Sequence, residues 1–129
     1  MMTKEEHIKY IIDAAATKYF KGYMDAEINE NTGEVIVPEG YYTQKEAWNV
    51  LADLQPRVSE KVTHTGRWWT EYVNVVQVLD KFYAFVTAKT SGDMSVYERG
   101  WEADYDFWEV TPVEIKTIDY VRVLEKTQT

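Results

Sequence analysis

The strongest structural signal in the chain lies in residues 67–90, which read RWWTEYVNVVQVLDKFYAFVTAKT. Val, Tyr, Phe, Trp and Thr dominate this stretch, and such side chains suit the pleated, half-buried surface of a β-strand. The run is interrupted at Asp80-Lys81. We therefore expect an antiparallel hairpin with strands over 69–79 and 82–90. The interrupting pair is not a favoured tight-turn dipeptide, so the exact register stays open.

Upstream of the hairpin, the sequence predicts an amphipathic helix over residues 3–24. Thr3 and Glu6 have the spacing of a capping box, in which each side chain accepts a hydrogen bond from a backbone N–H at the start of the helix. Apolar side chains then recur at helical spacing and should form one buried stripe. They are Ile8, Ile11, Ile12, Ala15, Tyr19, Phe20 and Tyr23.

A second helix is expected over residues 44–55, ended by Pro56. Thr43 and Glu46 repeat the capping-box spacing. The apolar side chains of this segment again share one helical face: Ala47, Val50, Leu51 and Leu54. Between the two helices, residues 34–37 are expected to form a short strand.

Downstream of the hairpin, the sequence predicts a strand over 94–103, with Gly100 as a bulge or bend, and a last strand over 113–124. Residues 57–66 are polar and suit a connector or a ragged strand. An order of helices first and strands afterwards favours an α+β fold. We expect two N-terminal helices packed on one face of a 3–5 stranded antiparallel sheet.

A chain of 129 residues suits one domain, here with a mainly helical half over 1–56 and a sheet half over 67–124. It contains no Cys, which rules out a disulfide scaffold and a thiolate metal site. No apolar stretch approaches the length of a membrane span or of a signal-peptide core. These features predict a cytoplasmic protein without membrane contact.

Negative charge is concentrated in two stretches of a chain whose net charge is −8. Residues 24–39 carry Asp25, Glu27, Glu30, Glu34 and Glu39 and no cation. Against the single cation Arg99, residues 91–114 carry Asp93, Glu98, Glu102, Asp104, Asp106, Glu109 and Glu114. Aromatic residues are interleaved with these acids, which favours an ordered surface over a solvated tail. The net charge argues against direct binding to nucleic acid.

The second acidic stretch is the candidate partner-binding site. Glu102, Asp104 and Asp106 alternate along the chain, and alternate residues of a strand point to the same face. Such a face suits docking on a basic protein, binding of Mg²⁺ or Ca²⁺, or simple solvation. The residues expected to contact a partner are Asp93, Glu98, Trp101, Glu102, Asp104, Tyr105, Asp106, Trp108 and Glu109.

Catalytic signatures are absent from the sequence. There is no glycine-rich phosphate loop, no Gly-x-Ser-x-Gly elbow and no Cys nucleophile. His7 and His64 have no carboxylate at ligand spacing, so we expect both to be ordinary histidines. The sequence therefore predicts a protein without catalytic residues, metal ligands or a cofactor, and not an enzyme.

Two aromatic pairs pose a question of exposure. Trp68 and Trp69 are adjacent, and adjacent strand residues point to opposite faces, so at most one of them enters a one-sided core. The other either packs at an edge or serves as an anchor for a partner. Tyr41 and Tyr42 pose the same question.

The part of the chain from about residue 67 to residue 123 resembles a recurring type of small bacteriophage protein. The matching elements are Arg67-Trp68-Trp69, Val73–Leu79, Phe82–Phe85, Gly100-Trp101-Glu102-x-Asp104, Glu109-Val110-Thr111-Pro112-Val113-Glu114 and Tyr120. The resemblance implies a phage or prophage origin. Small acidic phage proteins without catalytic motifs often resemble inhibitors of host defence, including anti-CRISPR and anti-restriction proteins.

We therefore expect a phage-type inhibitory protein. It would dock an acidic, aromatic surface on the basic nucleic-acid-binding channel of a host defence nuclease and block it sterically and electrostatically, without catalysis. Two alternatives remain open. One is a structural or self-association module, in which exposed aromatics pair two sheets as a homodimer. The other is a small carboxylate-based, metal-binding enzyme.

Overall fold

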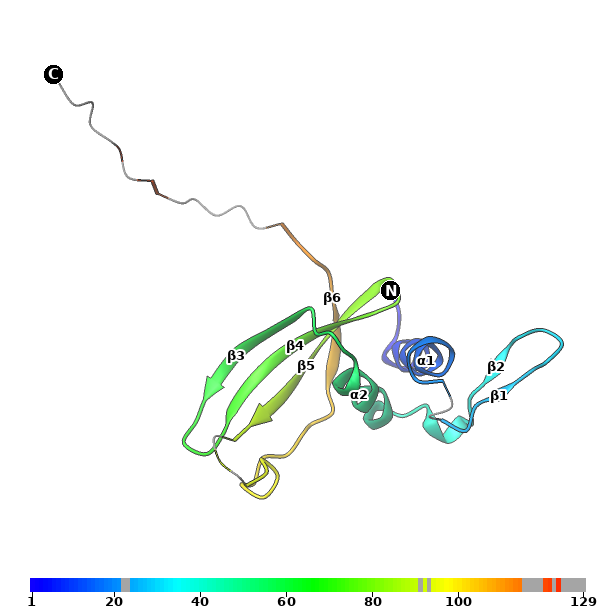
Figure 1. The fold of residues 1–129 in the computed structure, drawn as a ribbon, viewed down its shortest axis with the longest axis horizontal. Helices are drawn as coiled ribbons and strands as arrows, with labels where there is room; N and C mark the ends of the chain where they lie inside the picture. Colours follow the sequence, from blue (N-terminus) through cyan, green and yellow to red (C-terminus); the bar gives the residue numbers. More distant parts are fainter. Residues whose placement is uncertain (22–23, 91, 93, 115–119, 122, 124–129) are drawn as a thin grey trace.

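The computed structural model describes residues 1–21, 24–90, 92, 94–114, 120, 121 and 123. Within them it contains two α-helices, a four-stranded antiparallel sheet and a two-stranded antiparallel ribbon, which confirms the α+β prediction (Figure 1). In chain order the elements are α1 (Lys4–Ala14), the π-helical turn η1 (Ala15–Tyr19), β1 (Glu27–Ile28), β2 (Val35–Ile36), the 3₁₀ turn η2 (Glu39–Tyr41), α2 (Gln44–Asp53), β3 (Ser59–Thr65), β4 (Thr70–Val78), β5 (Lys81–Lys89) and β6 (Phe107–Val110).

The large sheet has the strand order β3-β4-β5-β6, so strands that are neighbours in sequence are also neighbours in space. The strands β4 and β5 form the predicted hairpin, with Thr70 opposite Lys89 and Val78 opposite Lys81. Leu79 has a φ of 54° and forms the turn with Asp80, one residue earlier than expected. The Leu79 N–H donates a hydrogen bond of 2.8 Å to the hydroxyl of Tyr19, which ties the turn to η1.

The helix α1 begins at the predicted capping box. Thr3 Oγ1 accepts a hydrogen bond from the Glu6 N–H at 3.2 Å, and Glu6 Oε1 accepts one from the Thr3 N–H at 3.1 Å. The helix ends at Ala14 rather than near residue 24 and continues only as η1. Thr17 Oγ1 donates to the Asp13 carbonyl at 2.8 Å, and this bond competes with the regular helical ladder. Of the predicted apolar stripe, Tyr23 lies outside the described residues.

The helix α2 and the ribbon follow their sequence signals closely. Thr43 Oγ1 accepts from the Glu46 N–H at 3.2 Å, and α2 runs from Gln44 to Asp53. The strand expected over 34–37 is β2, which pairs with β1 across a turn that contains Gly33 at a φ of 72°.

The prediction of a strand over residues 94–103 is wrong. This segment forms turns, with hydrogen bonds of 3.1 Å from the Gly100 N–H to the Tyr97 carbonyl and from the Trp101 N–H to the Val96 carbonyl. These bonds use backbone donors that a sheet ladder would need. Gly100 has a φ of 98°, so it forms the bend that the sequence offered as one option.

Two further segments were less determined by sequence. Residues 57–66 contain the strand β3, and its register with β4 shifts between Val62 and His64, which matches the ragged-strand alternative. Of the strand expected over 113–124, residues 113, 114, 120, 121 and 123 are described and are not in a strand. The rest of that prediction lies outside the described residues.

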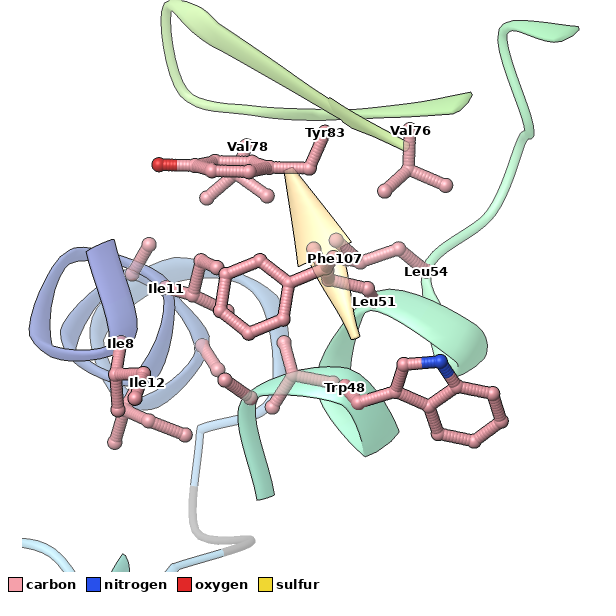
Figure 2. Packing of buried hydrophobic residues seen from close by; sticks show 14 of the residues in the cluster. Ile8, Ile11, Ile12, Trp48, Leu51, Leu54, Val76, Val78, Tyr83 and Phe107 are labelled. Atoms are coloured by element: carbon pink, nitrogen blue, oxygen red, sulfur yellow. The ribbon is translucent and has the colours of Figure 1, made fainter. Parts of the chain in front are cut away.

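The hydrophobic core lies between the two helices and one face of the large sheet (Figure 2). The helices contribute Ile8, Ile11, Ile12, Trp48 and Leu51, and Leu54 follows α2. The sheet contributes Val76, Val78, Tyr83, Phe85 and Phe107. Along β4 the even-numbered residues from Asn74 to Val78 are buried, while Gln77 is exposed. The helices therefore cover one face of the sheet, as predicted.

Candidate binding surfaces

The segment that carries the predicted site is not a strand but an irregular loop. We call residues 94–106 the acidic loop. Glu102, Asp104 and Asp106 are exposed, whereas Ala103 and Tyr105 are half-buried between them. Tyr105 has a φ of 58°, and its ring packs edge-on against Trp48 with the centroids 5.4 Å apart. The three carboxylates thus point outward as expected, although a loop anchored on α2 presents them instead of a strand face.

Two of the predicted site carboxylates are neutralised by lysines of the fold. Asp106 Oδ1 lies 3.0 Å from Nζ of Lys4, and Glu109 Oε2 lies 3.3 Å from Nζ of Lys81. The Lys4 ammonium also donates to the Phe107 carbonyl and lies 3.9 Å from the centroid of the Phe107 ring. Asp106 and Glu109 therefore hold β6 against α1 and β5.

The aromatic members of the predicted site divide between the interior and the surface. Trp101 is buried, and its indole N–H donates a hydrogen bond of 3.0 Å to Glu71 Oε1. Burial leaves Trp101 unable to anchor a partner, which differs from the prediction. Trp108 is 42% exposed on the face of β6 opposite the core. Asp93 lies outside the described residues.

Three predicted carboxylates remain exposed without a cationic partner. Within the described part of the chain, no Lys or Arg lies at ion-pair distance from Glu98, Glu102 or Asp104. Asp104 Oδ1 accepts a hydrogen bond of 2.9 Å from the Asp106 N–H, which fixes the local turn.

The two acidic stretches do not form one surface. Figure 1 shows the β1–β2 ribbon projecting beyond the helices, on the opposite side of α2 from the acidic loop. Among the described residues, the ion pairs lie instead around the helices and the sheet. Uncompensated negative charge is therefore displayed at two separate ends of the molecule.

Of the adjacent pair Trp68 and Trp69, Trp68 is the more exposed side chain. It is 47% exposed, and the guanidinium groups of Arg67 and Arg99 each lie 4.8 Å from the centroid of its ring. Trp69 is half-buried. The contact between Arg99 and Trp68 links the acidic loop to the residues just before β4. No local sequence pattern predicts this contact. Of the two tyrosines, Tyr42 donates a hydrogen bond of 2.6 Å from its hydroxyl to Asp13 Oδ1, and this bond ties it to α1.

The two histidines differ in their surroundings. His64 is exposed, and Nδ1 of His7 lies 2.7 Å from the Tyr83 hydroxyl. Burial is the main cause that lowers the pKa of His7, and it outweighs the opposing effect of Glu109, 3.7 Å from Nε2. Among the described residues, no three His, Asp or Glu side chains are grouped so that they could hold a metal ion.

The shifted pKa of His7 leads to a prediction about stability. Because the folded state holds this pKa below the unfolded value of 6.5, the unfolded chain takes up the proton more readily as the pH falls. Stability should therefore decrease between pH 7.5 and 5.5, about where His titrates. Urea denaturation at both pH values measures this. The variant His7→Gln should show a smaller decrease, and an equal decrease in both proteins would contradict the assignment to His7.

The face of the sheet turned away from the helices is a second candidate binding surface, and we call it the open face. It contains an apolar hollow of about 370 Å³. Its lining residues are Val58, Ser59, Lys61, Val73, Val75, Phe82, Ala84, Trp108, Val110, Thr111 and Pro112. The sequence placed Trp108 among the partner-binding residues but did not reveal this hollow, because side chains from four strands line it and the pairing of β6 with β5 brings Trp108 beside Ala84.

Searches of protein-family models, curated proteins and solved structures gave no match to this chain. The helices within the described residues are too short or too polar to cross a bilayer.

Proposed function

We propose that the protein is a non-catalytic binding protein that docks its acidic loop on a positively charged protein surface. The observation that carries this proposal is that the paired carboxylates and the unpaired carboxylates lie in different parts of the fold. Lysines neutralise the carboxylates near β6, while Glu98, Glu102 and Asp104 are left exposed at the loop. A basic partner surface would supply the cations that these exposed carboxylates lack among the described residues.

The loop also presents an aromatic side chain beside its carboxylates. Tyr97 is 58% exposed, and its ring contacts the buried Trp101 at a centroid distance of 5.6 Å. Trp101 is in turn held by Glu71, so Tyr97 rests on a fixed support. A side chain that is ordered before binding loses less entropy in the complex, and tyrosine is common among residues that dominate binding energy.

The partner class that we favour is a host defence nuclease, of the RNA-guided or restriction type. Such enzymes hold nucleic acid in positively charged channels. Carboxylates that occupy such a channel would exclude the phosphate backbone sterically and electrostatically, and no catalytic step is needed. The net charge of −8 would accelerate the encounter with a basic surface. The resemblance to phage proteins is consistent with this role.

A pair of matched charge-reversal variants tests the proposal. One carries Glu98→Lys, Glu102→Lys and Asp104→Lys in the acidic loop. The other carries Glu27→Lys, Glu30→Lys and Glu34→Lys in the ribbon and changes the net charge by the same amount. We expect the first variant to inhibit DNA cleavage by an RNA-guided nuclease or a restriction endonuclease about 30-fold or more less than the unmodified protein. The second should retain most of the inhibition.

The readout is the concentration of protein that halves the rate of cleavage. Raising the salt concentration to about 0.5 M should also weaken the inhibition by the unmodified protein. An unmodified protein without effect on either nuclease would refute this partner class. Equal losses in the two variants would show that overall charge, not the acidic loop, causes inhibition.

Self-association is a second candidate function. The apolar hollow on the face of the sheet turned away from the helices favours it, independently of the acidic loop.

A further inference from the structure

The hollow on the open face owes its shape to one small residue. Ala84 of β5 lies opposite Val75 of β4 on one side and opposite Trp108 of β6 on the other. A methyl group between two larger side chains leaves a depression in the surface of the sheet, because paired residues point to the same face. The hollow measures about 370 Å³. Pockets for small molecules commonly measure roughly 300–1,000 Å³, so the hollow is large enough for one small molecule.

The walls of the hollow are apolar and partly open to solvent. Trp108 is 42% exposed and Val58 56%. Phe82, Val73 and Val110 are half-buried beside them. A ligand that covers these side chains removes apolar surface from water, which is favourable. The hollow therefore fits a ligand with an apolar body.

One unpaired cation limits the kind of ligand further. Lys61 is the only charged side chain among the described residues that line the hollow, and it takes part in no ion pair among them. Glu71 of β4 shares the open face, but it accepts a hydrogen bond of 3.0 Å from the indole N–H of Trp101. Glu109 points to the other face of β6, where it pairs with Lys81 at 3.3 Å. The free ammonium of Lys61 therefore selects an anion.

We propose that the hollow binds a small amphipathic anion, a carboxylic acid with an elongated apolar body such as a medium-chain fatty acid. Its carboxylate pairs with the Lys61 ammonium, and its body lies against Trp108 and Phe82. Lys61 and Trp108 belong to β3 and β6, the two edge strands of the sheet. Four strands measure about 14 Å across, and the long Lys61 side chain shortens the gap, so a body of about ten carbons reaches from one residue to the other.

The hollow and the acidic loop are separate surfaces. None of the exposed loop carboxylates Glu98, Glu102 and Asp104 lines the hollow. The proposal is therefore independent of the docking on a basic partner, and either can fail without the other. A second copy on the open face would cover the same hollow, so ligand affinity is measured at a protein concentration where the chain is monomeric.

Three probes that share a ten-carbon body and differ in the head group test the proposal: decanoate, decanol and decyltrimethylammonium. Binding to the full chain is followed through the NMR signals of the tryptophan indole N–H groups. We expect decanoate to shift the signal of Trp108 and to leave the signal of Trp48, which belongs to the core, in place. Decanoate should bind at least about tenfold more tightly than decyltrimethylammonium, because Lys61 attracts one head group and repels the other.

Two variants with matched controls separate the roles of the charge and of the apolar wall. Lys61→Met should weaken the binding of decanoate about fivefold and change that of decanol less than about twofold. Lys45→Met, at an exposed position of α2, removes the same charge and should change neither. Val58→Asp should weaken both probes at least about fivefold, because it places a charge at the apolar wall. Ile28→Asp on the ribbon, where Ile28 is 67% exposed, should have no effect.

Three results would overturn the proposal. The first is a Trp108 signal that decanoate does not shift below its micellar concentration. The second is equal affinity for decanoate and decyltrimethylammonium. The third is a loss of decanoate affinity in Lys61→Met that is no larger than the loss in Lys45→Met.

Discussion

Replacing Phe107 by Ala should lower the free energy of unfolding by about 3–5 kcal/mol, the usual cost of deleting a buried aromatic ring. The Phe107 side chain is 1% exposed and lies between the sheet and the helices (Figure 2). It packs edge-on against Tyr83 with the ring centroids 6.0 Å apart, and the Lys4 ammonium covers it from α1. Its loss would leave a cavity at the point where β6, β5 and α1 meet.

The adjacent residue supplies a matched control. Trp108 is also aromatic and lies on the same strand, but it points to the open face. Trp108→Ala should therefore cost less than about 1 kcal/mol in the monomer, since exposed positions contribute little to folding stability. Urea denaturation of both variants, at a concentration where the chain is monomeric, gives the comparison. Similar losses in the two variants would mean that both faces of β6 are buried.

The second large effect is expected at Asn74, the one fully buried polar residue among those described. Its Oδ1 accepts a hydrogen bond from Nη1 of Arg57, and its Nδ2 donates to Thr87 Oγ1 at 2.8 Å. Arg57 also donates to the Ala52 carbonyl at 3.2 Å, near the end of α2. Asn74→Ala would leave these groups without a partner in the interior. We expect a loss of about 2–4 kcal/mol.

A double-mutant cycle separates this network from simple loss of volume. Arg57→Met and Asn74→Ala are each measured alone and then together by urea denaturation. If the two side chains act as one unit, the double variant should be less destabilised than the sum of the single ones, by about 1–3 kcal/mol. Strict additivity would show that the link between α2 and the sheet contributes nothing beyond the separate side chains.

The parts of the fold that the sequence predicts well are those specified by short-range patterns. Thr3 with Glu6 and Thr43 with Glu46 fix where α1 and α2 begin, because a cap involves residues three positions apart. The hairpin was predictable for the same reason, as its two strands are adjacent and their β-branched and aromatic content is continuous.

The remainder depends on contacts between distant residues. Nothing near Asp106 indicates that Lys4, at the other end of the chain, neutralises it. Trp101 was expected at the surface because acids flank it, but it is buried and its indole N–H donates a hydrogen bond to Glu71 of β4, about 30 residues earlier in the chain. The open face is likewise invisible in sequence, since an alternating strand pattern does not tell whether its second face is covered.

The most direct test of the account is hydroxyl-radical footprinting of the full chain at low and high protein concentration, read by mass spectrometry. Trp48 and Trp101 should be protected at both concentrations, because the fold itself buries them. Tyr97 should be reactive at both. Trp108 should be reactive in dilute protein and protected in concentrated protein, as its open face becomes covered. A Trp101 as reactive as Tyr97 would contradict the structure of the acidic loop, and a Trp108 indifferent to concentration would contradict the binding role of the open face.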